Sequence, residues 1–244
     1  MHINSVIVGT PVRDDSMAHP QSFFVTGTDT EIGKTYVIGL LMQAYGEVSK
    51  TAYFKPVQTG CYPDADGILQ APDFEEVYAQ STSQVCQDLH VPYRFEPACS
   101  PHLAASLAGE TISIAKIKQA YDKLMHRYET VLVEGAGGLL VPLSNRRFMI
   151  DLIAELGCAV IVVTSPRLGT LNHTMLTCMQ LDAYKIPIAA LVYNNHCNID
   201  PQNFIYKDNK VTLSQFIAPV PLLETGYQET DNDSIRRFCH ESLI

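Results

Sequence analysis

The chain has 244 residues, 46% of them hydrophobic and 18% charged, which is typical of one folded domain and unlike disordered, collagen-like or coiled-coil chains. Its 17 lysines and arginines against 26 aspartates and glutamates give a net charge of -9, which argues against a nucleic-acid partner. The 7 cysteines form no CxxC pair and no apolar run is long enough to cross a bilayer, so we expect a cytoplasmic protein with reduced thiols and no membrane contact.

Residues 1–20 are polar and show no periodicity, so we expect a loose N-terminal extension there and a single folded domain over 21–244. The folded part begins with a strand, a helix and a second strand. Phe23–Thr26 predicts the first strand, 34–48 the helix and 51–57 the second strand.

The rest of the chain continues this alternation. Parallel strands are expected at three runs rich in β-branched residues, 130–133, 159–163 and 188–193. Helices are expected at 73–80, 113–128, 148–156, 170–185 and 234–240. In the helix at 170–185, the four-residue spacing of Met175 and Met179 predicts the face turned to the core. The alternation predicts a doubly wound, mostly parallel sheet with helices on both faces, whose ligands bind at the carboxyl ends of the strands.

A glycine-rich loop follows the first strand and opens the first helix. Five residues separate Gly27 from Gly33, which precedes Lys34 and Thr35, so the loop has the phosphate-binding pattern with one residue more than usual. Glycines let backbone N–H groups surround phosphate oxygens, the lysine reaches the β- and γ-phosphates, and the threonine hydroxyl can bind Mg²⁺. A glycine-rich turn that binds nothing is the alternative. The flanking strand and helix favour a single P-loop NTPase domain.

Three more residues are candidates for the same site. Lys55 ends the second strand, beside the first loop of a doubly wound sheet, where it either points at the phosphates or is a solvated lysine. Glu134 directly follows the strand 130–133 and precedes a glycine-rich turn, a position where such enzymes hold Mg²⁺. Asp73 opens an expected helix, so it is either a metal partner or a first-turn acid favoured by the helix dipole.

Four segments in this order resemble the dethiobiotin synthetase family: GTDTEIGKT from Gly27, KPVQTG from Lys55, VEGAGG from Val133 and PRLGTLNH from Pro166. The resemblance covers about residues 23–223. The family consists of ATP-dependent enzymes that close the ureido ring in biotin synthesis. It implies Mg²⁺ as the cofactor, ATP, 7,8-diaminononanoate and CO₂ (or bicarbonate) as substrates, and a homodimer.

The resemblance also implies roles for individual residues. Lys34 and Lys55 are the implied catalytic residues, and Thr35, Asp73 and Glu134 the implied metal ligands. The implied nucleotide-binding residues are Glu31, Ile32, Gly33, Lys34, Thr35, Tyr36, Asp73, Glu134, Gly135, Ala136, Gly137, Asn194, Asn195, Pro221, Leu222 and Leu223. The implied substrate-binding residues are Thr30, Lys55, Thr59, Thr170, Leu171 and Asn172, the last three through their backbone across the dimer interface.

The implied reaction starts with a carbamate formed from CO₂ and one amine of the diamine. The carbamate oxygen attacks the γ-phosphate, and the second amine then displaces phosphate and closes the ring. Because every intermediate is more anionic than the diamine, positioning and charge stabilisation by Lys34, Lys55 and Mg²⁺ are expected to suffice. The sequence agrees, since it shows no GxSxG nucleophile motif.

Three alternatives remain open. An amidoligase of the cobyrinic acid type would carry a glutamine-hydrolysing domain, for which the chain shows no nucleophilic cysteine motif. A partitioning ATPase would have a signature lysine where this chain has Asp29, and often a basic amphipathic tail instead of the acidic 231–233. A duplicated enzyme that binds nucleotide without reacting is the third. The base preference also stays open, because 218–221 departs from the glycine-containing last loop of the family.

Overall fold

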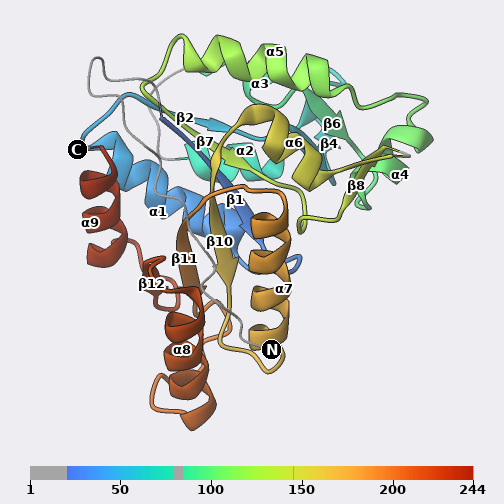
Figure 1. Ribbon diagram of the computed structural model, residues 1–244. Helices are drawn as coiled ribbons and strands as arrows, with labels where there is room; N and C mark the ends of the chain where they lie inside the picture. Colours follow the sequence, from blue (N-terminus) through green and yellow to red (C-terminus); the bar gives the residue numbers. More distant parts are fainter. Residues whose placement is uncertain (1–20, 80–84, 145, 244) are drawn as a thin grey trace.

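A six-stranded parallel sheet forms the centre of the computed structural model, which describes residues 21–79, 85–144 and 146–243 (Figure 1). The strands lie in the order β12-β11-β10-β1-β7-β2, and each neighbouring pair is parallel. Their bounds are Gln21–Gly27 for β1, Thr51–Phe54 for β2, Thr130–Glu134 for β7, Ala159–Thr164 for β10, Ile188–Asn194 for β11 and Leu222–Thr225 for β12. The chain winds outward from β1 in both directions, so the predicted doubly wound sheet is confirmed.

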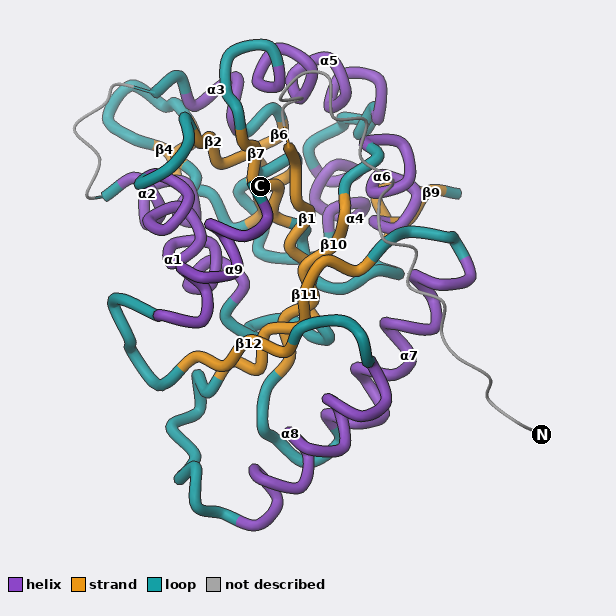
Figure 2. The backbone as a smooth tube through the Cα atoms, turned by 60° about the vertical axis from the view of Figure 1, so that its left-hand side comes forward, coloured by secondary structure: helices purple, strands orange, loops and turns teal. Residues whose placement is uncertain are grey.

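Helices cover both faces of this sheet (Figure 2). One face packs against α1 (Lys34–Gly46), α2 (Pro72–Tyr78) and α9 (Asp233–Ser242). The other face packs against α5 (Ile114–Met125), α6 (Met149–Leu156), α7 (Thr170–Ala183) and α8 (Phe204–Ile217). Successive side chains of β1 go to opposite sides, as in any strand: Phe24 joins the second cluster, whereas Phe23 and Val25 join the first. Burial on both faces explains why the strands read as continuous apolar runs.

Short elements surround this framework. β3 (Val57–Thr59) pairs with β6 (Tyr93–Phe95), β4 (Tyr62–Pro63) with β5 (Leu69–Gln70), and β8 (Pro142–Ser144) with β9 (Arg147–Phe148). Two short helices, α3 (Gln87–His90) and α4 (Pro101–Leu107), flank β6. Within the described ranges, no helix combines the length and apolarity needed to span a bilayer.

The expected strand 51–57 is shorter in the structure. β2 stops at Phe54, and the chain resumes as β3 in a separate two-stranded sheet. Pro56 explains the break, because proline has no N–H to continue a ladder. The expected extension 1–20 and the last residue of the expected helix 73–80 lie outside the described residues.

The methionine pair on α7 does not mark its buried face. Met179 is 60% exposed, and the buried residues of the helix are Thr170, Thr174, Cys178 and Leu181. Thr164 at the end of β10 explains this orientation, because its hydroxyl lies 2.6 Å from that of Thr170 and 2.7 Å from that of Thr174. Two buried hydroxyl contacts at the start of the helix thus turn its apolar stripe outward.

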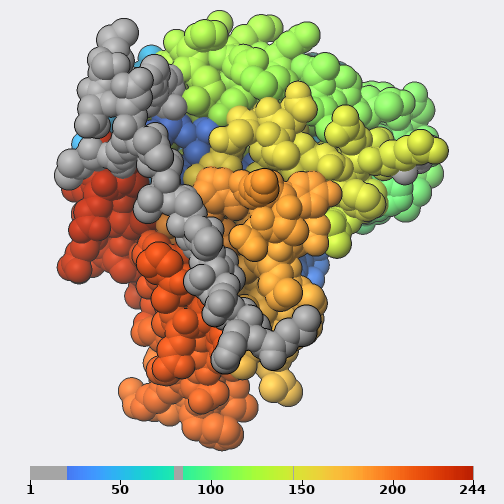
Figure 3. Space-filling view, viewed as in Figure 1, coloured from blue at the N-terminus to red at the C-terminus, as the bar shows by residue number. Residues whose placement is uncertain are grey.

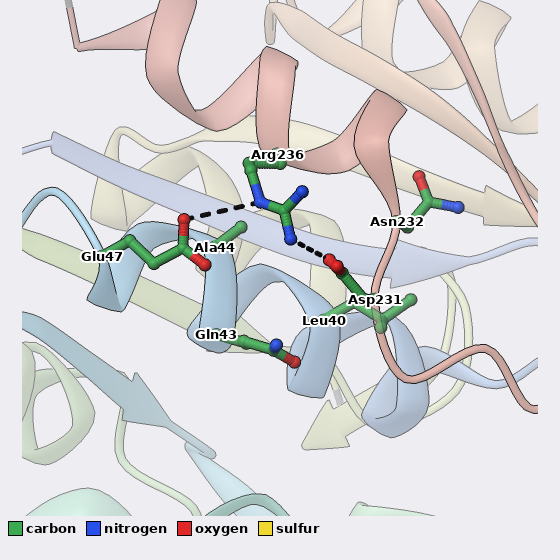
Figure 4. Close-up of a pocket in the computed structure, with 7 residues that line it drawn as sticks. All are labelled: Leu40, Gln43, Ala44, Glu47, Asp231, Asn232 and Arg236. Atoms are coloured by element: carbon green, nitrogen blue, oxygen red, sulfur yellow. Dashed lines mark hydrogen bonds and ion pairs between the residues drawn. The ribbon is translucent and has the colours of Figure 1, made fainter.

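Helix α9 packs on α1, the helix that begins at the phosphate loop. Its buried residues Ile235 and Cys239 join the core, and Arg236 forms ion pairs at the rim of a small cavity (Figure 4). The Arg236 guanidinium contacts the carboxylates of Glu47 and Asp231. Because these charges are partly solvated, the apolar contacts are the main attachment of α9.

Candidate active site

The loop between β1 and α1 lies at the carboxyl edge of the sheet. Gly33 forms the N-cap of α1 with φ 85°, and a Cβ at this position would lie 2.2 Å from the amide nitrogen of Asn194. Only glycine therefore fits here. Ile32 is 3% exposed and anchors the loop in the core. The result is a preformed turn in which free backbone N–H groups and the helix dipole favour a bound phosphate.

Lys34 follows this turn and is largely buried. Its Nζ donates to the carbonyl of Asp29 at 3.2 Å. Burial, reinforced by the charge of Lys55, lowers the pKa of Lys34 to about 8. A phosphate at the loop would favour the charged form, so this lysine is suited to bind an anion.

Lys55 joins two carboxylates that come from distant parts of the chain. Its Nζ donates to Asp73 Oδ2 at 2.5 Å and to Glu134 Oε1 at 2.7 Å. Burial acts to lower the pKa of Lys55, but Glu134 and Asp73 outweigh it, and the pKa is raised. Burial acts to raise the pKa of Asp73, but the charge and hydrogen bond of Lys55 outweigh it, so the pKa is lowered. Lys55 and Asp73 are therefore charged, and the two ion pairs hold the three side chains together.

The Glu134 carboxylate also accepts hydrogen bonds from two hydroxyl groups. Thr35 Oγ1 donates to its Oε1 at 3.0 Å, and the Tyr53 hydroxyl donates to its Oε2 at 2.8 Å. Burial, together with the nearby Glu134, raises the pKa of Tyr53 well above its usual value, so the phenol stays protonated. The hydroxyl of Thr35 keeps its lone pairs for a cation because its O–H donates a hydrogen bond to the carboxylate.

The donors at this point suit Mg²⁺. Thr35, Asp73 and Glu134 offer hard oxygen ligands, and Mg²⁺ usually takes only one or two carboxylates from a protein. No cluster of three or more His, Cys, Asp or Glu side chains that could hold a metal occurs in the described part of the chain. Phosphate oxygens and water would therefore complete the coordination of Mg²⁺.

One cavity of about 500 Å³ collects most of the residues predicted for the site. Its lining consists of Thr30, Glu31, Gly33, Lys34, Thr35, Lys55, Val57, Gln58, Thr59, Asp73, Glu134, Gly135, Ala136 and Gly137. Sequence reasoning missed Val57 and Gln58, although both lie within the KPVQTG segment, and it missed Tyr53, for which no motif gave a signal. Gln58 is buried and its Nε2 donates to the carbonyl of Thr59 at 3.1 Å.

The carboxyl end of β11 contacts the phosphate loop through Asn194. The Asn194 amide donates to the carbonyl of Ile32 at 2.9 Å and accepts from the hydroxyl of Thr225 at 2.7 Å. The next side chain, Asn195, hydrogen-bonds both the N–H and the carbonyl of Ile199. Asn194 thus ties β11 and β12 to the loop, whereas Asn195 closes a local turn.

The structure corrects the assignment of Pro221, Leu222 and Leu223 to the last nucleotide loop. β12 runs parallel to β11, with Leu222 opposite Leu191 and Thr225 opposite Asn194. The predicted residues therefore lie at the start of the strand, and Leu223 is buried in the core. The proline-rich segment before the strand resembles a binding loop in sequence, but the site is at the other end.

The residues after β12 are the ones that approach the phosphate loop. Tyr36, in the first turn of α1, donates its hydroxyl to the carbonyl of Glu229 at 2.8 Å. The carbonyl of Gly226 lies 3.4 Å from the same hydroxyl. The segment 226–229 therefore lies beside the first turn of α1, next to the phosphate loop.

Thr170, Leu171 and Asn172 do not line the cavity. They form the first turn of α7, after the N-cap Gly169 with φ 93°, and the Thr170 hydroxyl is buried against Thr164. No helical carbonyl precedes the N–H groups of Leu171 and Asn172, so they are available to an anion. Within one chain, the structure does not bring this segment together with Lys55.

Comparisons with known proteins agree with this geometry. A family model described as an AAA domain matches residues 21–230. The ATP-dependent dethiobiotin synthetase of Nitrosospira multiformis is 40% identical over 200 residues, which cover 82% of this chain and 85% of that protein. The enzyme of the same name from Fusobacterium nucleatum is 38% identical over 221 residues, covering 89% and 98%. The chain belongs to the dethiobiotin synthetase family. The resemblance carried by the four motifs is thereby confirmed.

Solved structures show the same fold at low identity. The hydrogenase maturation factor HypB of Archaeoglobus fulgidus matches with a TM-score of 0.52 and 13% identity, covering 93% of this chain and 92% of that one. A ParA family ATPase from Chlorobium tepidum matches with a TM-score of 0.53 and 9% identity, covering 92% and 99%. At such identities the likeness concerns the fold alone, and it confirms the P-loop NTPase architecture expected for a dethiobiotin synthetase family member.

Proposed function

We propose that the protein is an ATP-dependent dethiobiotin synthetase, which carboxylates 7,8-diaminononanoate with CO₂ and closes the ureido ring with release of ADP and phosphate. One observation carries the proposal: the charged Lys55 holds Asp73 and Glu134 beside the phosphate loop, inside a single cavity. This constellation can place a phosphate, a cation and an anionic substrate oxygen together. Family membership supports the choice of the diamine as substrate.

ATP would lie along the carboxyl edge of the sheet. The backbone from Glu31 to Tyr36 would surround the phosphates, and Lys34 would bind the β- and γ-phosphates. The turn 135–137 lines the same cavity and lets the nucleotide approach closely. We place the base near Asn194 and the segment 226–229, which lie next to the start of α1.

Thr35, Asp73 and Glu134 would hold Mg²⁺, which supplies positive charge to the phosphates when it is bound. The other groups act on the substrate. Thr30 and Thr59 line the same cavity as Lys55 and would bind the amines of the diamine.

The proposed chemistry needs positioned charge rather than a protein nucleophile. One amine takes up CO₂ and loses a proton, giving a carbamate. A carbamate oxygen attacks the γ-phosphorus, ADP leaves, and the second amine then attacks the carbonyl carbon and expels phosphate. Lys55 would hold the carbamate oxygen near the phosphate, and Lys34 would balance the charge that builds on the phosphoryl group; both line the cavity.

We also propose a homodimer formed through α7. Leu168 is 90% exposed, Leu176 58% and Met179 60%, and α7 lies open on the face shown in Figure 3. In such a dimer, the free N–H groups of Leu171 and Asn172 would receive the substrate carboxylate from the active site of the partner subunit. Light scattering at micromolar concentration tests this part, and a monomer would contradict it.

A cytoplasmic location belongs to the same proposal, since the 7 free cysteines suit a reducing compartment.

The function is tested by incubating the purified protein with ATP, Mg²⁺, bicarbonate and 7,8-diaminononanoate, omitting each component in turn. Phosphate release and dethiobiotin mass are followed together. We expect equal amounts of phosphate and dethiobiotin, and neither product when the diamine is omitted. ATP hydrolysis that is indifferent to the diamine would favour a switch ATPase instead. No hydrolysis at all would favour a nucleotide-binding relative that has lost the reaction.

A further inference from the structure

Tyr53 stands out because it is fully buried and its hydroxyl donates a hydrogen bond to the Glu134 carboxylate of the site. It lies on β2, at the edge of the sheet, opposite Leu132 of β7. Alternate residues of a strand share a face, so Tyr53 and Lys55 point to the same side as Glu134. The Tyr53 hydroxyl reaches Glu134 Oε2 at 2.8 Å.

This contact completes the hydrogen bonding of the Glu134 carboxylate. Oε1 accepts from Lys55 and from Thr35, and Oε2 accepts from Tyr53. Glu134 is 1% exposed, so water does not replace a lost donor at low cost. A hydrogen bond from a phenol to a buried carboxylate is strong and directional, and it fixes the rotation of the carboxyl group.

Tyr53 is itself held by side chains that cover the free edge of β2. Its backbone N–H donates to the hydroxyl of Tyr78 at 3.1 Å, and its carbonyl lies 2.5 Å from Nδ1 of His90. The rings of Tyr53 and Tyr78 meet edge to face, with centroids 6.3 Å apart. The edge strand thus has hydrogen-bonding partners although no further strand pairs with it, and the phenol has a defined direction.

We propose that Tyr53 is a positioning residue for the Mg²⁺ form of the nucleotide. By holding Oε2 of Glu134, it turns Oε1 toward the hydroxyl of Thr35. Thr35 then donates its hydrogen bond to the carboxylate and presents its lone pairs to the cation. The inference deepens the proposed function and rests on its Mg²⁺ site.

The test compares the affinity of a non-hydrolysable ATP analogue in Mg²⁺ with its affinity in EDTA, both by titration calorimetry without diamine. Tyr53→Phe removes only the hydroxyl and keeps the ring packing. We expect roughly tenfold weaker binding in Mg²⁺, the low end of what losing an outer partner of a metal site costs, and an unchanged affinity in EDTA. Binding in EDTA also reports that the variant folds.

Tyr78→Phe is the matched control. It removes a phenol from the same aromatic cluster, but that phenol bonds the backbone of Tyr53 and not Glu134. The ratio of the affinities in Mg²⁺ and EDTA should therefore stay as in the wild type. An equal loss under both conditions for Tyr53→Phe, or no loss in Mg²⁺, would overturn the proposal.

A double-mutant cycle separates action through Glu134 from a general effect on the fold. In a Glu134→Gln background, Tyr53→Phe should cause no further loss of affinity in Mg²⁺. A full additional loss in that background would refute the assigned path. Because neither measurement involves the diamine, a failure of ring closure would leave this result interpretable, and the reverse also holds.

Discussion

The two halves of the sheet's carboxyl edge carry different kinds of polar side chain. At the ends of β1, β2 and β7, charged groups surround an open cavity, with Lys55 bridging Asp73 and Glu134. At the ends of β11 and β12, uncharged side chains such as Asn194 and Thr225 bind one another and the phosphate loop. The first half is thus equipped for phosphoryl chemistry, and the second holds the loop in shape.

The largest effect should come from Lys55→Ala, which removes the cation of the charged half. Buried Glu134 and half-buried Asp73 would lose their shared partner, and in the proposed reaction the carbamate and γ-phosphate would lose their positioning group. We expect ring closure to fall by at least about 100-fold, while ATP binding stays largely intact. Steady-state kinetics and calorimetric ATP titration measure the two quantities.

Lys118→Ala is the control for this variant, since Lys118 also forms an ion pair, with Asp122, but on the surface of α5. It should leave turnover unchanged. Unchanged turnover in Lys55→Ala itself would refute the role assigned to Lys55.

Gly33→Ala should have the next largest effect, because it acts where the two halves meet. The new methyl group would collide with the Asn194 amide, and the left-handed φ of 85° disfavours alanine. We expect loss of ATP binding and a lower melting temperature.

Gly39→Ala is the control within the same helix, since a Cβ there meets nothing within 4 Å. It should stabilise the protein by about 0.5–1 kcal/mol, and similar behaviour of the two variants would contradict the account.

The central fold could be predicted from the sequence because its strands are buried on both faces. The runs at 131–133 and 159–163 are apolar throughout, and each ends near a turn. β12 was not predicted. It is a four-residue edge strand in which buried Leu223 and Thr225 alternate with half-buried residues, so its pattern is too short to recognise.

That Lys34, Lys55 and Glu134 line one cavity was predictable, because Lys34 opens the helix after the glycine-rich loop and the other two lie at the carboxyl ends of their strands. Tyr53 was not predictable, because its role depends on which strand lies beside β2 and on which face its ring points. Proline-rich segments occur at either end of a strand, which is why 221–223 was assigned to the wrong end of β12.

Asn194→Ala tests the second half of the comparison and should have a moderate effect. The hydrogen bond from Asn194 to the Ile32 carbonyl shapes the phosphate loop. Its loss should weaken the binding of ATP and of inorganic triphosphate alike, by about tenfold. Competition binding with the two ligands measures this. A loss confined to ATP would mean that the amide acts only on the base and does not shape the loop.

The smallest effect concerns His90, whose imidazole contacts the backbone carbonyl of Tyr53 at the free edge of β2, in the charged half of the sheet. His90 is 2% exposed, and burial lowers its pKa below the usual value of 6.5. The unfolded chain therefore binds more protons than the folded one once the pH falls below about 6.5, and the free energy of unfolding should decrease there by at most about 1.4 kcal/mol per pH unit. Urea unfolding between pH 5 and 7.5 measures this slope.

His90→Asn keeps an N–H donor near the Tyr53 carbonyl but cannot take up the proton. It should reduce the slope of unfolding free energy against pH, whereas the same change at the exposed His102 should not. If His90→Asn leaves the slope unchanged, other groups cause the loss of stability in acid. A reduced slope would show that the covered edge of β2 depends on a neutral imidazole.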